Sequence, residues 1–80
     1  MKVERVRAMT NNFAYNVRFL RKARRINQKE LAAIVGKSVR TICAWERGTR
    51  LPLVEDVYVL AQYFGTDMET LYFGEVNAGI

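Results

Sequence analysis

Histidine is absent from this chain of 80 residues, and cysteine and serine occur once each, as Cys43 and Ser38. The side chain most often used for acid–base catalysis is therefore missing. No pair of carboxylates has an evident acid–base setting, and the sequence lacks the histidine and cysteine clusters that hold metal ions. We therefore expect no enzyme activity, no metal site and no cofactor.

A single cysteine also excludes a disulfide within the chain and favours a reducing compartment. No apolar run approaches the ~20 residues that span a bilayer, and the sequence contains no signal-peptide pattern. These absences predict one cytoplasmic domain with no membrane partner. For Cys43 we expect a small filler side chain, and a redox-sensing thiol is the alternative.

Lysine and arginine are absent after residue 50. Residues 1–50 hold all 13 of them against three glutamates, a net charge of +10, whereas residues 51–80 hold five acids, a net charge of −5. This division predicts a polyanionic partner for the first part and a second part kept off that partner. An anionic membrane is the competing partner, but the basic part lacks an amphipathic helix with a bulky apolar face.

Residues 27–48 carry the clearest local signals, and they predict two short helices joined by a tight turn. Residue types suited to helix ends occur at each boundary: Asn27 with Glu30, Gly36, Ser38 and Gly48. Since very few residues separate the two helices, they must cross steeply instead of lying antiparallel. That is the helix-turn-helix geometry.

Both helices carry apolar residues at helical spacing, and the second has an outward face of a different kind. In the first, Leu31, Ile34 and Val35 recur at helical spacing, and in the second Ile42 and Trp45 give an inward face. The outward face of the second helix carries small or basic residues spaced i, i+3, i+4 and i+7, namely Arg40, Cys43, Ala44 and Arg47. Such a helix fits the major groove of DNA, and a solvated helix face is the alternative.

This stretch resembles the phage-repressor-type (Xre/Cro/cI-like) helix-turn-helix DNA-binding family in Gln28, Leu31, Ala32, Gly36, Ser38, Thr41, Ile42 and Trp45-Glu46-Arg47-Gly48. The similar flanking residues are Leu20-Arg21-Lys22, Pro52, Leu60-Ala61, Phe64-Gly65, Asp67-Met68 and Leu71. The resemblance covers about residues 13–73 and implies an all-α, five-helix, lambda-repressor-like domain. It also implies a sequence-specific transcriptional regulator, commonly a repressor, that binds double-stranded operator DNA as a homodimer.

The resemblance assigns roles to particular residues. The helix over residues 39–47 would enter the major groove, and its base-reading residues would be Val39, Arg40, Cys43 and Ala44. Arg40 is the best candidate for a bidentate contact to guanine. The expected phosphate contacts are Gln28, Lys37, Thr41, Arg47, Thr49 and Arg50. Arg21 and Glu46 match a family ion pair, so we expect them to join the first helix to the recognition helix.

The helix before the motif is expected over about residues 13–24. Asn12 can cap it, and its inner face would be Phe13, Val17 and Leu20. Arg25 stands where the family usually has the glycine that ends this helix. Either the helix end is less sharply capped, or Arg25 accepts a strained conformation.

After the motif, Pro52 fits the first turn of a helix over about residues 53–64. Leu53 cannot cap this helix, so Pro52 and the acids Glu55 and Asp56 must stabilise its start. Its expected inner face is Val54, Val57, Leu60, Ala61 and Phe64. Gly65 would end it, and Asp67 would cap a last short helix that contains Met68, Leu71 and Tyr72.

The predicted organisation is an N-terminal arm or extension over residues 1–12, the domain over 13–73 and a tail over 74–80. No separate effector domain is expected, so control by a small-molecule ligand is not indicated. The last helix and the tail are rich in apolar residues. Candidates for a homodimer contact there are Met68, Tyr72, Phe73 and Val76, with burial in the core as the alternative.

A rival function uses the same fold. A protein-interaction or antitoxin-like domain would act mainly through a protein partner, and the apolar C-terminal residues leave this reading open. The basic first part favours DNA. A steep fall of affinity with salt would identify DNA as the partner, whereas a flat profile would identify a protein.

Overall fold

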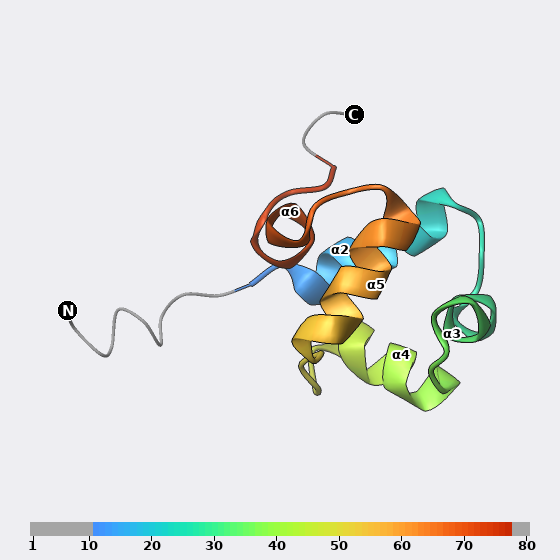
Figure 1. The fold of residues 1–80 in the computed structure, drawn as a ribbon. Helices are drawn as coiled ribbons and strands as arrows, with labels where there is room; N and C mark the ends of the chain where they lie inside the picture. Colours follow the sequence, from blue (N-terminus) through green and yellow to red (C-terminus); the bar gives the residue numbers. More distant parts are fainter. Residues whose placement is uncertain (1–10, 78–80) are drawn as a thin grey trace.

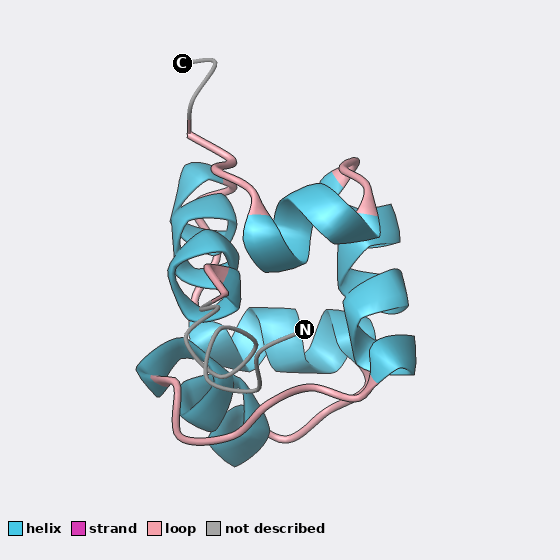
Figure 2. Ribbon diagram, turned by 90° about the vertical axis from the view of Figure 1, so that its left-hand side faces the viewer, coloured by secondary structure: helices cyan, strands magenta, loops and turns pink. Residues whose placement is uncertain are grey.

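The computed structural model describes residues 11–77, which form five α-helices joined by loops. In chain order they are α2 (Phe13–Ala23), α3 (Gln28–Val35), α4 (Val39–Arg47), α5 (Val54–Phe64) and α6 (Met68–Phe73). No strand occurs in this part of the chain (Figure 2), which confirms the predicted all-α class. None of these helices is long and apolar enough to cross a membrane. Most of the predicted arm, residues 1–10, and the end of the tail, residues 78–80, lie outside the described residues.

Helix α5 crosses α2, with α3 and α4 towards one side of this pair and α6 towards the other (Figure 1). The main packing partners are α2 with α4, α3 with α4, α2 with α6, and α5 with α6. All five helices contribute to one core, whose largest fully buried side chains are Trp45, Phe13, Leu31, Ile42, Leu60, Leu71, Val17 and Asn16. The rings of Phe13 and Trp45 meet edge to face with centroids 5.8 Å apart. This contact fixes α4 to α2 within the core.

Two apolar residues of the predicted helices lie on the surface, and one of them, Val54, was assigned to an inner face. Ile34 is 47% exposed and Val54 is 67% exposed. The buried residues of α3 are Leu31 and Ala32, so its inner face is centred between them and Ile34 lies beyond its edge. Val54 is the first residue of α5 and lies at the edge of the face that Val57 begins. The assignment of Val54 was wrong because periodicity gives the spacing of a face but not its centre, and the exposure of Ile34 shows the same for α3.

The start of α2 also differs from the prediction. Asn12 occupies the N-cap position, but its side chain makes no capping hydrogen bond. Its Nδ2 group instead donates to the carbonyl oxygens of Phe73, at 3.1 Å, and Gly74, at 2.9 Å. Asn11 supplies the local contact, since its Oδ1 accepts from the Phe13 N–H at 3.1 Å. The amide of Asn12 therefore joins the start of α2 to the end of α6.

Asn16 is a buried polar residue of α2 that was not predicted from the sequence. Its Nδ2 group donates to the carbonyl oxygens of Thr70, Leu71 and Gly74 at 3.3, 2.8 and 3.0 Å. Carbonyl groups at a helix C-terminus have no N–H donor within the helix, so the Asn16 amide supplies donors to the end of α6. The position three residues after Phe13 was a signal that Asn16 faces inward.

The end of α2 decides between the two alternatives for Arg25. This residue has φ of 60°, in the left-handed region, and is the only non-glycine residue with positive φ among residues 11–77. Arg25 therefore accepts the strained conformation that glycine usually occupies. For a residue with a side chain, the left-handed conformation costs roughly 1–2 kcal/mol.

The start of α5 corrects the role of Pro52 and supports that of Asp56. Leu53 is the N-cap residue, with extended φ and ψ of −73° and 161°, and the helix begins at Val54. Pro52 therefore precedes the helix instead of lying in its first turn. Asp56 stabilises the start as expected, because its Oδ2 accepts from the Leu53 N–H at 3.0 Å. A carboxylate at this position also interacts favourably with the helix dipole.

Asp67 caps α6, as predicted. Its carboxylate accepts from the Thr70 N–H at 2.7 Å and from the Thr70 hydroxyl at 3.0 Å. These hydrogen bonds, the backbone one first, hold the pKa of the Asp67 carboxyl below its ordinary value. The preceding helix ends at Gly65 in the left-handed conformation, which confirms that boundary too.

Candidate nucleic-acid interface

Hydrogen bonds between near neighbours fix the start of α3 and the turn from α3 to α4. Asn27 and Glu30 form a reciprocal capping box: the Glu30 N–H donates to Asn27 Oδ1 at 2.7 Å, and the Asn27 N–H donates to Glu30 Oε1 at 2.8 Å. Gly36 ends α3 with φ of 72°, a conformation that favours glycine. Ser38 Oγ accepts from the Thr41 N–H at 3.1 Å and so caps α4. These contacts confirm the predicted helix ends.

Helix α4 turns one face to the core and the opposite face outward. Ile42 and Trp45 are buried in the core, as expected. The expected base-reading residues lie on the other side of the helix, where Val39 is 42% exposed, Arg40 is exposed, and Cys43 and Ala44 are half-buried. Arg47 follows on the same side and is exposed. The structure thus presents a helix surface of small side chains between two guanidinium groups.

Arg21 and Glu46 come together between α2 and α4. Arg21 donates from Nε to Glu46 Oε2 at 2.7 Å and from Nη2 to Glu46 Oε1 at 3.0 Å, a bidentate geometry. Nη1 of the same guanidinium donates to the Ile26 carbonyl at 2.9 Å. Both side chains are largely buried. The hydrogen bond to Glu46 is the main cause that raises the pKa of Arg21 above its ordinary value, with burial acting against it.

Gln28 extends this network to α3. It is the first residue of that helix, and its Nε2 donates to Glu46 Oε1 at 3.1 Å. The side chain therefore braces α4. Glu46 accepts hydrogen bonds from two different helices, so the C-terminal end of α4 is held by both.

The other expected phosphate contacts are distributed around α4. Arg47, Thr49 and Arg50 are exposed near its C-terminal end. The Thr49 hydroxyl donates to the Ala44 carbonyl at 3.3 Å, and Nη1 of Arg50 lies 3.5 Å from the Thr41 hydroxyl. This side of the molecule therefore presents the guanidinium groups of Arg47 and Arg50, which are donors suited to phosphate oxygens, while the Thr49 hydroxyl proton is used within the chain.

Lys37 differs from these residues because its ammonium already has a partner. It lies in the turn between α3 and α4, and its Nζ is 2.8 Å from Asp56 Oδ1 at the start of α5. No pattern in the sequence indicates this ion pair, since the two residues are far apart in the chain and belong to different elements.

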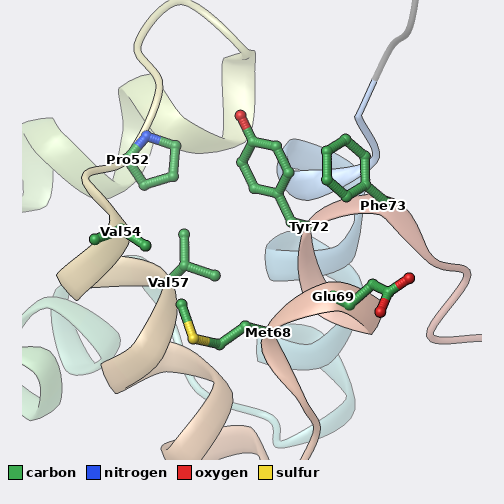
Figure 3. Close-up of a pocket in the computed structure, with 7 residues that line it drawn as sticks. All are labelled: Pro52, Val54, Val57, Met68, Glu69, Tyr72 and Phe73. Carbon is green, nitrogen blue, oxygen red and sulfur yellow. The ribbon is translucent and has the colours of Figure 1, made fainter.

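Three of the four dimer-contact candidates line an apolar groove of about 370 Å³ between α5 and α6: Met68, Tyr72 and Phe73. Figure 3 shows the side chains of Val57 and Met68 pointing toward each other, with Glu69 directed away from them. The ring of Tyr72 also packs against Phe13, at 5.9 Å between centroids, so this residue belongs partly to the core. Val76 is half-buried in the tail and does not line the groove.

No metal-binding group is formed in the described part of the chain, where no three or more Cys, Asp and Glu side chains gather suitably. Cys43, the one cysteine, is half-buried on α4 with a free thiol. The arrangement around α4 is therefore one of hydrogen-bond donors and positive charge, suited to an extended anionic surface.

Comparison with known proteins bears on this surface. A family model described as helix-turn-helix matches residues 17–71. The cryptic phage CTXphi transcriptional repressor RstR of Vibrio cholerae is 37% identical over 59 residues, covering 74% of this chain and 53% of the relative. The chain therefore spans about half the length of this curated relative.

Solved structures are similar as well. The P22 c2 repressor protein, in a crystal structure with synthetic operator 9T and Tl+, has a TM-score of 0.74 and 28% identity, covering 79% of this chain and 96% of that one. A transcriptional regulator from Listeria innocua has a TM-score of 0.76 and 26% identity, covering 85% and 63%. The enzyme HppE, in its Co(II) complex with substrate, has a TM-score of 0.67 at 24% identity over 81% of this chain and 36% of that one, which shows a shared fold alone.

Proposed function

The chain belongs to the phage-repressor-type (Xre/cI-like) helix-turn-helix family, and from this premise we propose that it is a sequence-specific DNA-binding transcriptional regulator that acts as a repressor. The observation that carries the proposal is the outward face of α4, with small side chains between exposed arginines. Two similarities support it: the RstR relative is a transcriptional repressor, and the P22 c2 repressor was solved in complex with an operator. The proposal includes no catalytic activity and a cytoplasmic location.

In this proposal α4 lies in the major groove with its N-terminal end first. The base-reading residues are Val39, Arg40, Cys43 and Ala44. Arg40 donates two hydrogen bonds to one guanine, and Val39 packs on a thymine methyl group. Cys43 and Ala44 offer few hydrogen bonds, so DNA shape supplies the rest of the specificity.

The phosphate contacts surround that groove. The expected donors are Gln28, Thr41, Arg47, Thr49 and Arg50, which are distributed over α3, α4 and the following loop. Such contacts fix the position of the protein on the duplex without reading its sequence. Because all 13 lysines and arginines precede residue 51, the negative second part of the chain keeps the orientation on DNA unambiguous.

A homodimer completes the proposal. Its contact surface is the α5–α6 groove with Met68, Tyr72 and Phe73, together with Val76 of the tail. One of the residues that line the groove, Pro52, follows the end of α4 closely in the chain. A twofold contact there brings two recognition helices into one assembly, which reads half-sites about 34–36 Å apart.

The first test is a selection from random duplex DNA, repeated with Arg40→Ala. The wild-type chain should enrich a palindromic motif, and the variant should lose the preference for guanine at one position per half-site, a discrimination of about 1–3 kcal/mol. Arg18→Ala is the matched control, because it removes another exposed arginine, from α2. An unchanged motif in Arg40→Ala would contradict the assigned contact.

The rival function is a protein-interaction or antitoxin-like domain. The apolar groove between α5 and α6 favours it, since such a groove also suits a protein partner. The absence of any enriched motif, with a partner affinity that does not change with salt, would establish the rival.

A further inference from the structure

Lys37 lies in the turn between the end of α3 and the start of α4. Gly36 ends α3 in the left-handed conformation, and Ser38 is the N-cap of α4. The Lys37 N–H donates to the Ala32 carbonyl at 2.9 Å, so its backbone is held at the turn. A contact that restrains the Lys37 side chain therefore also restrains the turn that precedes the N-terminal end of α4.

Asp56 holds that side chain from α5. The residue is 8% exposed, and its two carboxylate oxygens have separate partners. Oδ2 accepts from the Leu53 N–H at 3.0 Å, and Oδ1 lies 2.8 Å from Lys37 Nζ. Because the first contact orients the carboxylate, the second has a defined direction and the ion pair needs little further ordering.

The pair joins two parts of the fold that pack on different neighbours. Helix α4 packs mainly on α2 and α3, whereas α5 packs mainly on α6. Within residues 11–77 the ion pairs are Arg21–Glu46 and Lys37–Asp56. The first holds the C-terminal end of α4, and the second holds the turn that precedes its N-terminal end. The recognition helix is thus fixed by one ion pair near each end.

We propose that Lys37 is a positioning residue for DNA recognition, which sets the N-terminal end of α4 against α5 through Asp56. From the sequence, Lys37 was expected to contact a phosphate. In this proposal it does not, because Asp56 already neutralises its ammonium group. The base-reading residues that depend on this position are Val39 and Arg40, in the first turn of α4. The inference rests on the proposed DNA-binding function and adds to it the means by which the reading end of α4 is oriented.

The test compares Lys37→Met, Asp56→Asn and the double variant on the duplex that the wild-type chain selects. The two explanations differ in sign for Asp56→Asn. This change makes the protein more positive, so it would strengthen binding if charge alone mattered. If the ion pair positions α4, Asp56→Asn should instead weaken binding about three- to tenfold, as should Lys37→Met, since the pair is partly exposed, at 35% and 10% of the side chains. The double variant should be no weaker than either single variant.

The salt dependence of binding separates the two roles of Lys37, because a phosphate contact contributes to the slope of log affinity against log salt and a positioning residue does not. Loss of one phosphate contact lowers the slope of log affinity against log salt by about 0.9. Lys37→Met should leave this slope unchanged. Glu55→Gln is the matched control, because it removes a neighbouring exposed acid of α5 and should not weaken binding. Circular dichroism and thermal melting establish that each variant is folded at the assay temperature.

A lower salt slope in Lys37→Met, with undiminished affinity in Asp56→Asn, would overturn the inference and make Lys37 a phosphate contact. If Asp56→Asn is unfolded at the assay temperature, the test depends on Lys37→Met, which removes no capping group. The salt slope of that variant then decides between the two explanations. Failure of the wild-type chain to select any duplex would instead refute the proposed function, so the two failures are distinguishable.

Discussion

At the residue scale, Arg25 holds a strained backbone conformation, with φ of 60°. The neighbouring Arg24 lies with its guanidinium carbon 4.8 Å from the centre of the Tyr63 ring, so the end of α2 is also held against α5. The turn after α2 is therefore kept by packing in spite of an unfavourable backbone conformation at one residue.

Arg25→Gly should raise the free energy of unfolding by about 0.5–1 kcal/mol, because glycine adopts the left-handed conformation without the steric cost of a side chain. Urea unfolding measures the change. Arg25→Ala is the control, since it removes the same charge but keeps a side chain at positive φ. Equal stability of the two variants would show that charge, and not the backbone conformation, decides the effect.

At the scale of secondary-structure elements, what the sequence predicted well was local. The caps at Asn27, Ser38 and Asp67 each use a hydrogen bond to the residue three positions later, and all three are present. Such bonds need only the local chain to be helical, so residue type and spacing are sufficient to predict them.

Features that depend on the packing of distant elements were predicted less well. The exposed positions of Ile34 and Val54 follow from where the neighbouring helices lie, which a periodic pattern does not specify. For the same reason, the side chain of Asn12 was expected to cap α2 but instead contacts the end of α6. Around α4, the expected roles came from family resemblance, while the Lys37–Asp56 pair needed the three-dimensional structure.

The cap of α6 predicts a pH dependence. The folded pKa of Asp67 lies below its ordinary value of 3.8, because the ionised carboxylate accepts hydrogen bonds from Thr70. The stability that this cap contributes is therefore fully present above the ordinary pKa and is lost as the pH falls through the folded pKa. Asp67→Asn keeps an oxygen acceptor but does not titrate.

The difference in free energy of unfolding between the wild-type chain and Asp67→Asn should thus be constant above about pH 5 and should shift against the wild type below the ordinary pKa. Denaturant unfolding at a series of pH values from 2 to 7 measures it. A difference that stays constant over the whole range would show that Asp67 contributes nothing to the acid sensitivity of the fold.

At the scale of the whole molecule, the division of charge matches the arrangement of the helices. The cations precede residue 51 and so belong to the part that contains α2, α3 and α4, whereas α5 and α6 carry acids and no cations. The apolar groove with Phe73 lies in the acidic part, between α5 and α6. A molecule built in this way can meet a polyanion with one part and another protein surface with the other.

The homodimer proposal makes a definite prediction for Phe73, which is 50% exposed and therefore replaceable at little cost to the core. Phe73→Asp should raise the dissociation constant of the dimer at least about tenfold, as expected for an aromatic contact residue. The effect is amplified because a twofold interface contains each residue twice. Sedimentation equilibrium measures the dimer, and binding to full and half operators measures its consequence.

The variant should lose affinity for a full palindromic site and keep the affinity of one protomer for a half-site, since α4 is untouched by the change. Tyr15→Asp is the control, because Tyr15 is an aromatic residue of similar exposure on α2, outside the groove. If Phe73→Asp dimerises as the wild-type chain does, the contact between protomers lies on another surface. In that case the groove between α5 and α6 is available to a different protein, which is what the rival function requires.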